Sequence, residues 1–359
     1  MYKHIISINR NQEVDMQTGK DNKKNRVTVN DIAKASGISI ATVSRAVNHP
    51  ELVNGRTAAR IQAAMNELGY SPRNNSSLIP PDSLLINIQT PVNSFYAKVI
   101  EGIAASAKLH GYRVLINQDV YDSDEKIGEL AQRIKLNNIK GIVFINALSS
   151  SYFSNISEMV PLVQCLEPIS TDYSCVSIDN QRAVYSIMEH LFRQGKRNIV
   201  FLNGPQESIY AKERQDAFIS FMELNSLALR DGQIINLPSD NYDMALSTFV
   251  RLLSSSDLPE AVFAVSDLMA AAVINAARIC RIDVPEQMLV AGFNNDDYSM
   301  ISQPKITTVS QPLFNIGYTA GEILYDYVSN RTSKPTRFIR LDTELIIRES
   351  TMAPISGQN

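Results

Sequence analysis

Residues 31–45 read DIAKASGISIATVSR, and this stretch decides the fold of the N-terminal part of the chain. Its constrained positions match a helix-turn-helix. Ala33 is small where two helices approach, Gly37 can adopt a positive φ in the tight turn, and Val43 can face the core. We therefore predict two short helices joined by a tight turn, the second of them over about 40–48.

Capping signals indicate where these helices begin and end. Thr28, followed three residues later by Asp31, resembles a capping box that opens the first helix, and Ser39 can cap the second. A third helix is predicted over about 55–68, where apolar residues recur on one face and Gly69 provides a C-terminal stop. The segment thus reads as a three-helix domain.

The second of these helices carries residues suited to reading DNA. In a helix-turn-helix its N-terminal part faces the major groove, where Arg45 is the one long donor and Ile40 and Ala41 can contact thymine methyl groups. Short hydrogen-bonding side chains suited to phosphates are Thr28, Thr42, Ser44, Asn48 and Thr57. The alternative is an ordinary three-helix domain whose polar groups are merely solvated.

The charge distribution favours the DNA-binding interpretation. Residues 20–78 contain nine Lys or Arg and four Asp or Glu, a balance of +5, although the whole chain of 359 residues carries −3. A basic head on an acidic body predicts that the head meets a polyanion and the body does not.

The larger part of the chain reads as an α/β domain. A polar, proline-containing stretch over 71–81 marks a linker, and beyond it short apolar runs alternate with amphipathic stretches. Predicted strands are 84–88, 113–117, 141–145, 162–166, 199–202, 261–265 and 289–293, with helices such as 97–110, 183–194 and 268–281 between them. The length favours two stacked, doubly wound parallel-sheet subdomains, with a ligand cleft between them at the carboxyl ends of the strands.

Other residues give little support for catalysis or metal binding. Cys165, Cys175 and Cys280 are far apart and read as buried apolar residues of a reducing compartment. No nucleophile motif, phosphate-binding loop or dinucleotide fingerprint is present in the sequence. No apolar run approaches the length of a membrane span, and no apolar signal core precedes the basic region. We therefore expect a cytoplasmic protein that is not an enzyme and uses no cofactor or metal.

These motifs together resemble the lactose-repressor/galactose-repressor family of transcriptional regulators. The resemblance rests on 27–33 (VTVNDIA), 39–48 (SIATVSRAVN), 68–72 (LGYSP), 176–180 (VSIDN), 199–205 (IVFLNGP), 264–267 (AVSD), 290–293 (VAGF) and 306–311 (ITTVSQ). It extends from about residue 27 to Thr351. It implies a homodimer whose two headpieces read double-stranded operator DNA with an inverted repeat, and a sensor similar to periplasmic sugar-binding proteins with three crossovers between its subdomains.

The resemblance also implies domain boundaries and site residues. The expected parts are a mobile tail (1–26), the helix-turn-helix domain (27–72), a hinge (73–82), an effector-binding and dimerisation domain (83–352) and a tail (353–359). The subdomains are 83–180 with 312–340, and 181–311 with 341–352. Leu78 matches the hinge residue that enters the minor groove. The expected effector-binding residues are Phe95, Tyr96, Arg214, Ser266, Asp267 and Asn294.

Two departures from the family pattern affect these expectations. Asn294 stands where an acidic residue is usual, so the recognised hydroxyl pattern differs, because an amide donates as well as accepts. The hinge around Leu78 is about one residue short and runs into two prolines at 80–81.

The favoured function is a DNA-binding transcription regulator, a repressor of a carbohydrate-utilisation operon, controlled by a small ligand in the sensor cleft. Arg, Asp and amide groups with an aromatic neighbour suit a sugar. Alternatives are a solute-binding receptor without a regulatory role, and a regulator controlled by a partner protein or a nucleobase.

Overall fold

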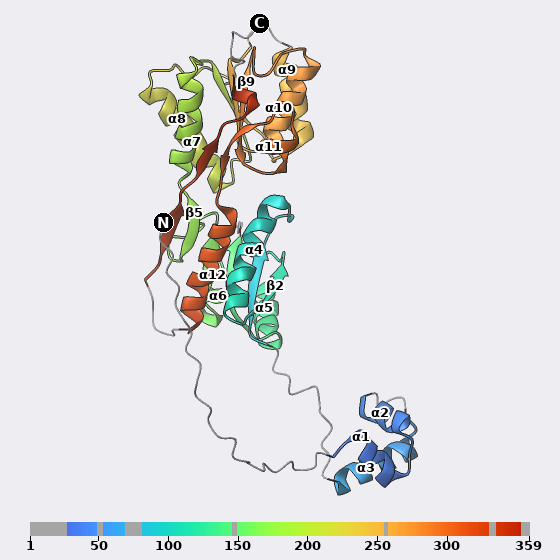
Figure 1. Ribbon diagram of the computed structural model, residues 1–359. Coiled ribbons are helices and arrows are strands. Elements are labelled where there is room, and N and C mark those ends of the chain that lie inside the picture. Colours follow the sequence, from blue (N-terminus) through green and yellow to red (C-terminus); the bar gives the residue numbers. More distant parts are fainter. Residues whose placement is uncertain are drawn as a thin grey trace, which may run out of the picture. The chain divides into compact units, whose positions relative to one another are not determined.

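The computed structural model describes residues 27–48, 53–68, 81–145, 149–254, 258–329 and 335–352. The chain divides into two compact units, Met1–Ile79 and Pro80–Asn359, whose elements are labelled in Figure 1. The predicted tails 1–26 and 353–359, and the predicted hinge residue Leu78, lie outside the described residues.

The first unit contains three helices, α1 (Val29–Ser36), α2 (Ile40–Asn48) and α3 (Gly55–Glu67), and the prediction of three helices is confirmed. Gly37 ends α1 with a φ of 63°, the left-handed conformation that favours glycine. The helices share a small apolar core formed by Ile32, Ala33, Val43, Ile61, Ala64 and Met65.

The predicted caps are also present in this unit, which is called the headpiece below. The backbone N–H and the hydroxyl of Thr28 both donate to the Asp31 carboxylate, at 2.8 and 2.7 Å, and these bonds lower the pKa of Asp31. The Ser39 hydroxyl accepts the Thr42 N–H at 3.2 Å. The start of each of the first two helices is thus fixed by its own side chains.

The second unit is built on two six-stranded sheets, each forming one subdomain. The first sheet has the order β11-β5-β4-β3-β1-β2 and the second β12-β10-β9-β8-β6-β7. Every neighbouring pair is parallel except β10 and β12, which are antiparallel. The first sheet contains β1 (Ser83–Ile88), β2 (Arg113–Asn117), β3 (Ile139–Ile145), β4 (Leu162–Cys165), β5 (Cys175–Ile178) and β11 (Phe338–Leu341). The second contains β6 (Ile199–Asn203), β7 (Ile234–Asn236), β8 (Ala261–Ala264), β9 (Leu289–Asn294), β10 (Thr307–Ser310) and β12 (Glu344–Ile346).

Helices cover both sheets, as the doubly wound fold class requires. The first subdomain has α4 (Ser94–Leu109), α5 (Asp124–Leu136), α6 (Phe153–Met159) and α12 (Leu313–Ser329). The second has α7 (Asn180–Arg193), α8 (Ile209–Leu224), α9 (Tyr242–Leu253), α10 (Asp267–Ile279) and α11 (Asp297–Ile301), followed near the C-terminus by a short 3-10 turn, Glu349–Thr351. Along β1, Leu84 and Ile86 join the core beneath α4 and α12, whereas Leu85 joins a separate cluster with α5 and α6. This alternation confirms a sheet buried on both faces.

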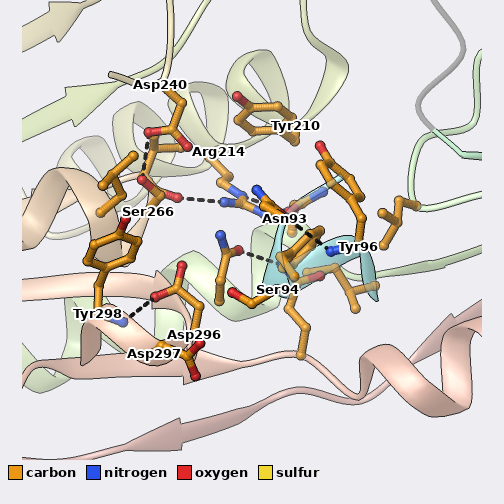
Figure 2. A pocket seen from close by; sticks show the side chains of 18 of the residues that line it. Asn93, Ser94, Tyr96, Tyr210, Arg214, Asp240, Ser266, Asp296, Asp297 and Tyr298 are labelled. Carbon is orange, nitrogen blue, oxygen red and sulfur yellow. Dashed lines mark hydrogen bonds between the residues drawn. The ribbon is translucent and has the colours of Figure 1, made fainter. Parts of the chain in front are cut away.

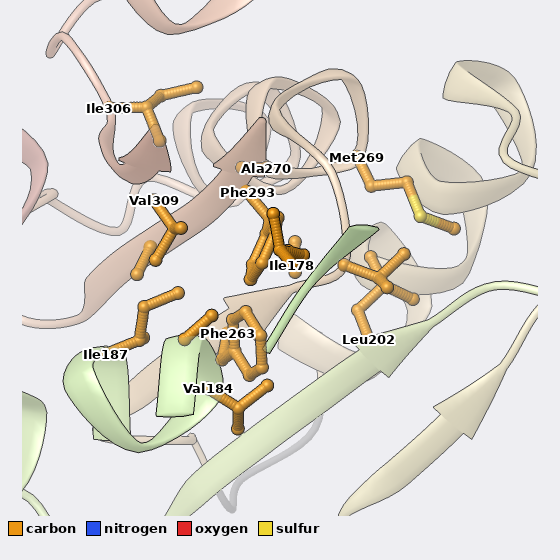
Figure 3. Packing of buried hydrophobic residues seen from close by; sticks show 14 of the residues in the cluster. Ile178, Val184, Ile187, Leu202, Phe263, Met269, Ala270, Phe293, Ile306 and Val309 are labelled. Atoms are coloured by element: carbon orange, nitrogen blue, oxygen red, sulfur yellow. The ribbon is translucent and has the colours of Figure 1, made fainter. Parts of the chain in front are cut away.

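The core of the second subdomain reaches the cleft between the subdomains. Figure 3 shows Val184 and Ile187 of α7 beside Phe263 of β8 and Phe293 of β9. Phe263 and Phe293 are both fully buried. Because Phe293 lies at the carboxyl end of β9, this core also supports the residues that line the cleft.

The chain passes between the two sheets three times. It crosses between β5 and α7, between β10 and α12, and between β11 and β12. All seven predicted strands are present, whereas five short strands of three or four residues were missed from the sequence: β5, β7, β10, β11 and β12.

Helices α4 and α12 approach each other unusually closely. A Cβ at Gly102 would lie 2.1 Å from the carbonyl oxygen of Phe314, and one at Gly317 would lie 2.0 Å from the carbonyl oxygen of Val99. Only glycine fits at such a contact. The pairing matters for the site because the first turn of α4 carries Phe95 and Tyr96.

Candidate functional site

The exposed side of α2 presents the residues expected to read DNA. Ile40 is 55% exposed, and Ala41 and Arg45 are exposed as well, whereas Thr42 and Ser44 are half-buried. Ile40 and Ala41 lie in the first turn of α2, whereas Arg45 lies in its last turn. An exposed apolar side chain and a long donor on one helix suit contact with base edges in a groove. The geometry therefore leaves these exposed residues of α2 available to a partner.

Three of the five residues expected to contact phosphates lie at or next to helix ends. Thr28 precedes the first turn of α1, Thr57 lies in the first turn of α3, and Asn48 is the last residue of α2, with its side chain outside the described residues. Backbone N–H groups at helix N-termini favour anions such as phosphates. Arg60 has a structural contact, because its Nη2 donates to the Ser36 carbonyl at 2.9 Å and joins α3 to the end of α1.

The second candidate site is a cavity of about 570 Å³ in the sensor unit. Its walls come from both subdomains: the start of α4 and the segment after β4 on one side, and α8, α11 and the ends of β8 and β9 on the other. Figure 2 shows Asn93, Ser94 and Tyr96 facing Asp240, Ser266 and Tyr298 across it. The cavity, called the cleft below, lies where parallel strands end, as the sequence predicts.

Arg214 on α8 is the central cation of the cleft. It is only 5% exposed; its Nε donates to Asn180 Oδ1 and its Nη1 to the Val265 carbonyl, both at 2.9 Å. Its guanidinium lies 3.6 Å from the centre of the Phe293 ring. Burial lowers the pKa of Arg214 to about 10, so it remains charged near neutral pH. Nη2 makes no hydrogen bond within the described residues and is free to bind a ligand.

Two carboxylates from separate loops line the second subdomain's side of the cleft. Asp240 Oδ1 accepts the Ser266 hydroxyl at 2.7 Å, and Asp296 Oδ1 accepts the Tyr298 N–H at 2.9 Å. Asp240 is exposed as a whole residue, but the protein shields its carboxyl group from part of the surrounding water, which raises its pKa. The same shielding, together with the nearby Asp240, raises the pKa of Asp296 to about 6.

Glu167 connects the two subdomains. It follows β4 in the first subdomain, and its Oε2 accepts the Ile209 N–H, at the N-terminus of α8 in the second, at 2.9 Å. Burial raises the pKa of Glu167, although this hydrogen bond and Arg214 oppose the shift. A carboxylate at a helix N-terminus is favoured by the helix dipole, so this contact stabilises the arrangement of the two subdomains in this structure.

Asn294 takes a conformation that few residues adopt. Its φ is 107°, and its Oδ1 accepts Nε2 of Gln311 at 2.9 Å. Gln311 also lines the cleft and precedes α12, where the chain returns to the first subdomain. A strained residue held by a side chain at a crossover is typical of a ligand-binding site.

The structure brings most of the expected effector-binding residues together. Phe95, Tyr96, Arg214, Ser266 and Asn294 line the cleft. Asp267 does not line it. It is fully buried, and its Oδ2 accepts the Asp296 N–H at 2.9 Å, so it shapes the loop that carries Asp296. Sequence reasoning missed several polar lining residues, namely Asn93, Glu167, Asn180, Tyr210, Asp240 and Asp296. Of these, only Asn180 lay in a motif already quoted.

Comparisons with known proteins identify the family. The family described as bacterial regulatory proteins, lacI family, matches residues 28–73, and the periplasmic binding protein-like domain matches residues 188–351. The HTH-type transcriptional regulator DegA of Bacillus subtilis is 30% identical over 344 residues, covering 91% of this chain and 98% of DegA. The chain belongs to the lacI family of bacterial regulatory proteins.

Other lacI-family relatives agree with this assignment. The HTH-type transcriptional repressor CytR of Escherichia coli is 28% identical over 91% of this chain and 96% of its own length. The lac repressor dimer bound to operator has the same fold, with a TM-score of 0.67 and 21% identity over 92% of this chain and 100% of that one. The complex of the regulator CelR with cellobiose gives a TM-score of 0.66 and 23% identity over 90% of this chain and 100% of CelR.

This lacI-family protein is therefore a DNA-binding transcriptional regulator, as the sequence predicted, and its curated relatives are regulators as well. Within the described residues, no helix is long and apolar enough to cross a membrane.

Proposed function

We propose that this regulator acts as a repressor of a carbohydrate-utilisation operon. It binds an inverted-repeat operator as a homodimer, with α2 of each headpiece in the major groove and Arg45 contacting a guanine. A small polyhydroxylated effector, a sugar, binds in the cleft and changes the affinity for DNA. The sugar bound to the relative CelR and the operator bound to the lac repressor dimer support these assignments.

One observation carries this proposal: the cleft of about 570 Å³ is built from both subdomains around the buried Arg214. A ligand there contacts both subdomains at once, so it binds one relative arrangement of them more tightly than another. Such a ligand must be thermodynamically linked to any property that depends on this arrangement, DNA binding included. The size suits a mono- or disaccharide.

The types of residue that line the cleft support ligand binding and not catalysis. No histidine or cysteine is among the described residues that line the cleft, and the described part of the chain contains no cluster of potential metal ligands. We therefore propose that the protein is not an enzyme and needs no cofactor. We also propose a cytoplasmic location, because the headpiece needs access to DNA.

The test is a fluorescence anisotropy titration with DNA from upstream of the protein's own operon and with random DNA of equal length. A panel of sugars and nucleobases is then added to the complex. We expect tight binding to the upstream DNA only, and a sugar-dependent change in affinity. A nucleobase response would transfer the proposal to that effector class. Equal affinity for both DNAs would favour a solute receptor, and contradict the proposal.

A further inference from the structure

The described residues that line the cleft carry more acidic than basic side chains. The carboxylates that line it are Glu167, Asp240, Asp296 and Asp297, and Arg214 is the one cationic side chain among its described lining residues. If all five groups are ionised, the cleft is strongly negative. An anionic ligand such as a sugar phosphate would be repelled.

The charges of Glu167 and Arg214 are already balanced within the protein. Glu167 binds the N-terminus of α8 and is close enough to Arg214 for the guanidinium to oppose the rise in its pKa. Arg214 in turn donates to Asn180 and to the Val265 carbonyl. The remaining negative charge therefore lies on the second subdomain's side of the cleft, around Asp240 and Asp296.

These two carboxylates each have an oxygen left for a ligand. Asp240 uses Oδ1 to accept the Ser266 hydroxyl, and Asp296 uses Oδ1 to accept the Tyr298 N–H. Within the described residues, neither Oδ2 receives a hydrogen bond. Figure 2 shows both carboxylates on the same side of the cleft, with Ser266 and Tyr298 between them.

The nearby cations Arg214 and Lys98 do not fully offset the charges of Asp240 and Asp296, because the pKa of each carboxyl is still raised. The pKa of Asp296 is raised by shielding from water and by Asp240, and Lys98, which opposes the shift, does not overcome it. The pKa of Asp240 is raised as well. Asp240 raises the pKa of Asp296, and the two carboxylates face one cavity. A cation placed between two such carboxylates is bound favourably, because it removes their repulsion.

We propose that the effector is an amine-bearing polyol, such as an amino sugar, whose ammonium group lies between Asp240 and Asp296. An ammonium has three donors, which matches the two free carboxylate oxygens and the neighbouring Ser266 hydroxyl. The hydroxyl groups of the same ligand face Arg214 and the amides of Asn180 and Asn294. The inference rests on the proposed role of the cleft as the effector site.

The experiment compares matched ligands by calorimetric titration of the full-length protein near neutral pH. The probes are glucose with glucosamine, galactose with galactosamine, and glucose 6-phosphate. For at least one pair, we expect the amino sugar to bind about tenfold or more tightly than its neutral parent, and the phosphate not to bind.

Variants locate the ammonium group. D240N and D296N keep the shape of each side chain and remove its charge, so each should reduce the preference for the amino sugar about tenfold or more while leaving the neutral parent within about twofold. D243N on the exposed first turn of α9, whose carboxylate does not line the cleft, is the matched control and should change neither. Thermal melting confirms that each variant is folded.

The outcomes separate this inference from the proposed function. If neutral sugars bind as tightly as their amino partners, or if D240N and D296N leave the preference unchanged, the inference is overturned while the cleft remains a sugar sensor. Tight binding of glucose 6-phosphate would also overturn it. If no probe binds and none changes operator affinity, the inference and the sugar-sensing proposal fail together.

Discussion

The contact between α4 and α12 gives a prediction with opposite signs for two similar substitutions. Gly317→Ala places a Cβ 2.0 Å from the Val99 carbonyl oxygen. An ordinary carbon–oxygen contact is about 3.3 Å or longer, so the two helices must separate by more than about 1 Å. In α5, by contrast, Gly128→Ala meets no atom within 4 Å.

These distances set the expected magnitudes. Forcing a methyl group into a closed contact costs about 1–3 kcal/mol or more, and an alanine in a helix returns only about 0.5–1 kcal/mol of that cost. For a domain of this size about 1 kcal/mol corresponds to a shift of about 2–4 °C in Tm. We therefore expect Gly317→Ala to lower Tm by several degrees and Gly128→Ala to raise it by about 1–4 °C.

Thermal melting followed by circular dichroism, at equal protein concentrations, measures both shifts. The prediction extends to the cleft, because moving α4 also moves Phe95 and Tyr96 in its first turn. Effector affinity should fall in Gly317→Ala and stay unchanged in Gly128→Ala. A Tm for Gly317→Ala equal to or above that of the wild type would refute the reasoning.

Substitutions at three further positions and one pH titration test other parts of the molecule. Arg45→Ala should lower the affinity for operator DNA about 5- to 150-fold per half-site and leave effector binding intact. Fluorescence anisotropy measures the affinity for DNA. If the variant still prefers operator DNA over random DNA as strongly as the wild type does, Arg45 does not read bases. Arg214→Lys keeps the charge but cannot reproduce the fork that binds Asn180 and the Val265 carbonyl. It should weaken effector binding about 10- to 150-fold in calorimetry, and retained affinity would contradict its central role. Glu167→Ala removes the hydrogen bond from the Ile209 N–H and should weaken effector binding severalfold. Glu167→Gln keeps an acceptor, so it should weaken effector binding less. Equal losses of affinity in the two variants would show that this hydrogen bond does not support effector binding. Finally, the pKa of Asp296 is about 6, set by shielding from water and by Asp240, Asp297 and Lys98. Because protonation below that pH removes its negative charge, the affinity for an amino sugar should fall between about pH 7 and about pH 5 in the wild type and fall less in D296N.

Features that depend on neighbouring residues were predictable from the sequence. The bounds of α2 follow from Ser39 and from the spacing of Gly37 and Val43, all within a few residues. The strands β1, β3, β6 and β9 are continuous apolar runs, as buried parallel strands should be. Arg214 was expected from the resemblance to the family, although its hydrogen-bond partners were not.

Features that depend on the assembled fold were not predictable. Asp240 lies in a loop without a recognisable motif, and only the fold brings it to Ser266, 26 positions further along the chain. Asp267 and Asp296 illustrate the same limit. The sequence favoured Asp267 as a ligand-binding residue, whereas the structure places it beneath the loop that holds Asp296 at the cleft. Short range patterns do not determine which of two acidic residues faces a cavity.

The two strands β11 and β12 have a consequence for how this protein is made. They follow each other directly near the C-terminus, yet each forms the outer edge of a different sheet, beside β5 and β10 respectively. During synthesis, the edges of β5 and β10 that these two strands cover therefore stay unpaired until residues 338–346 have left the ribosome. Unpaired strand edges are sites of aggregation. We expect nascent chains that end before residue 336 to depend on chaperones in both subdomains, and the last segment to complete both of them in a single late step.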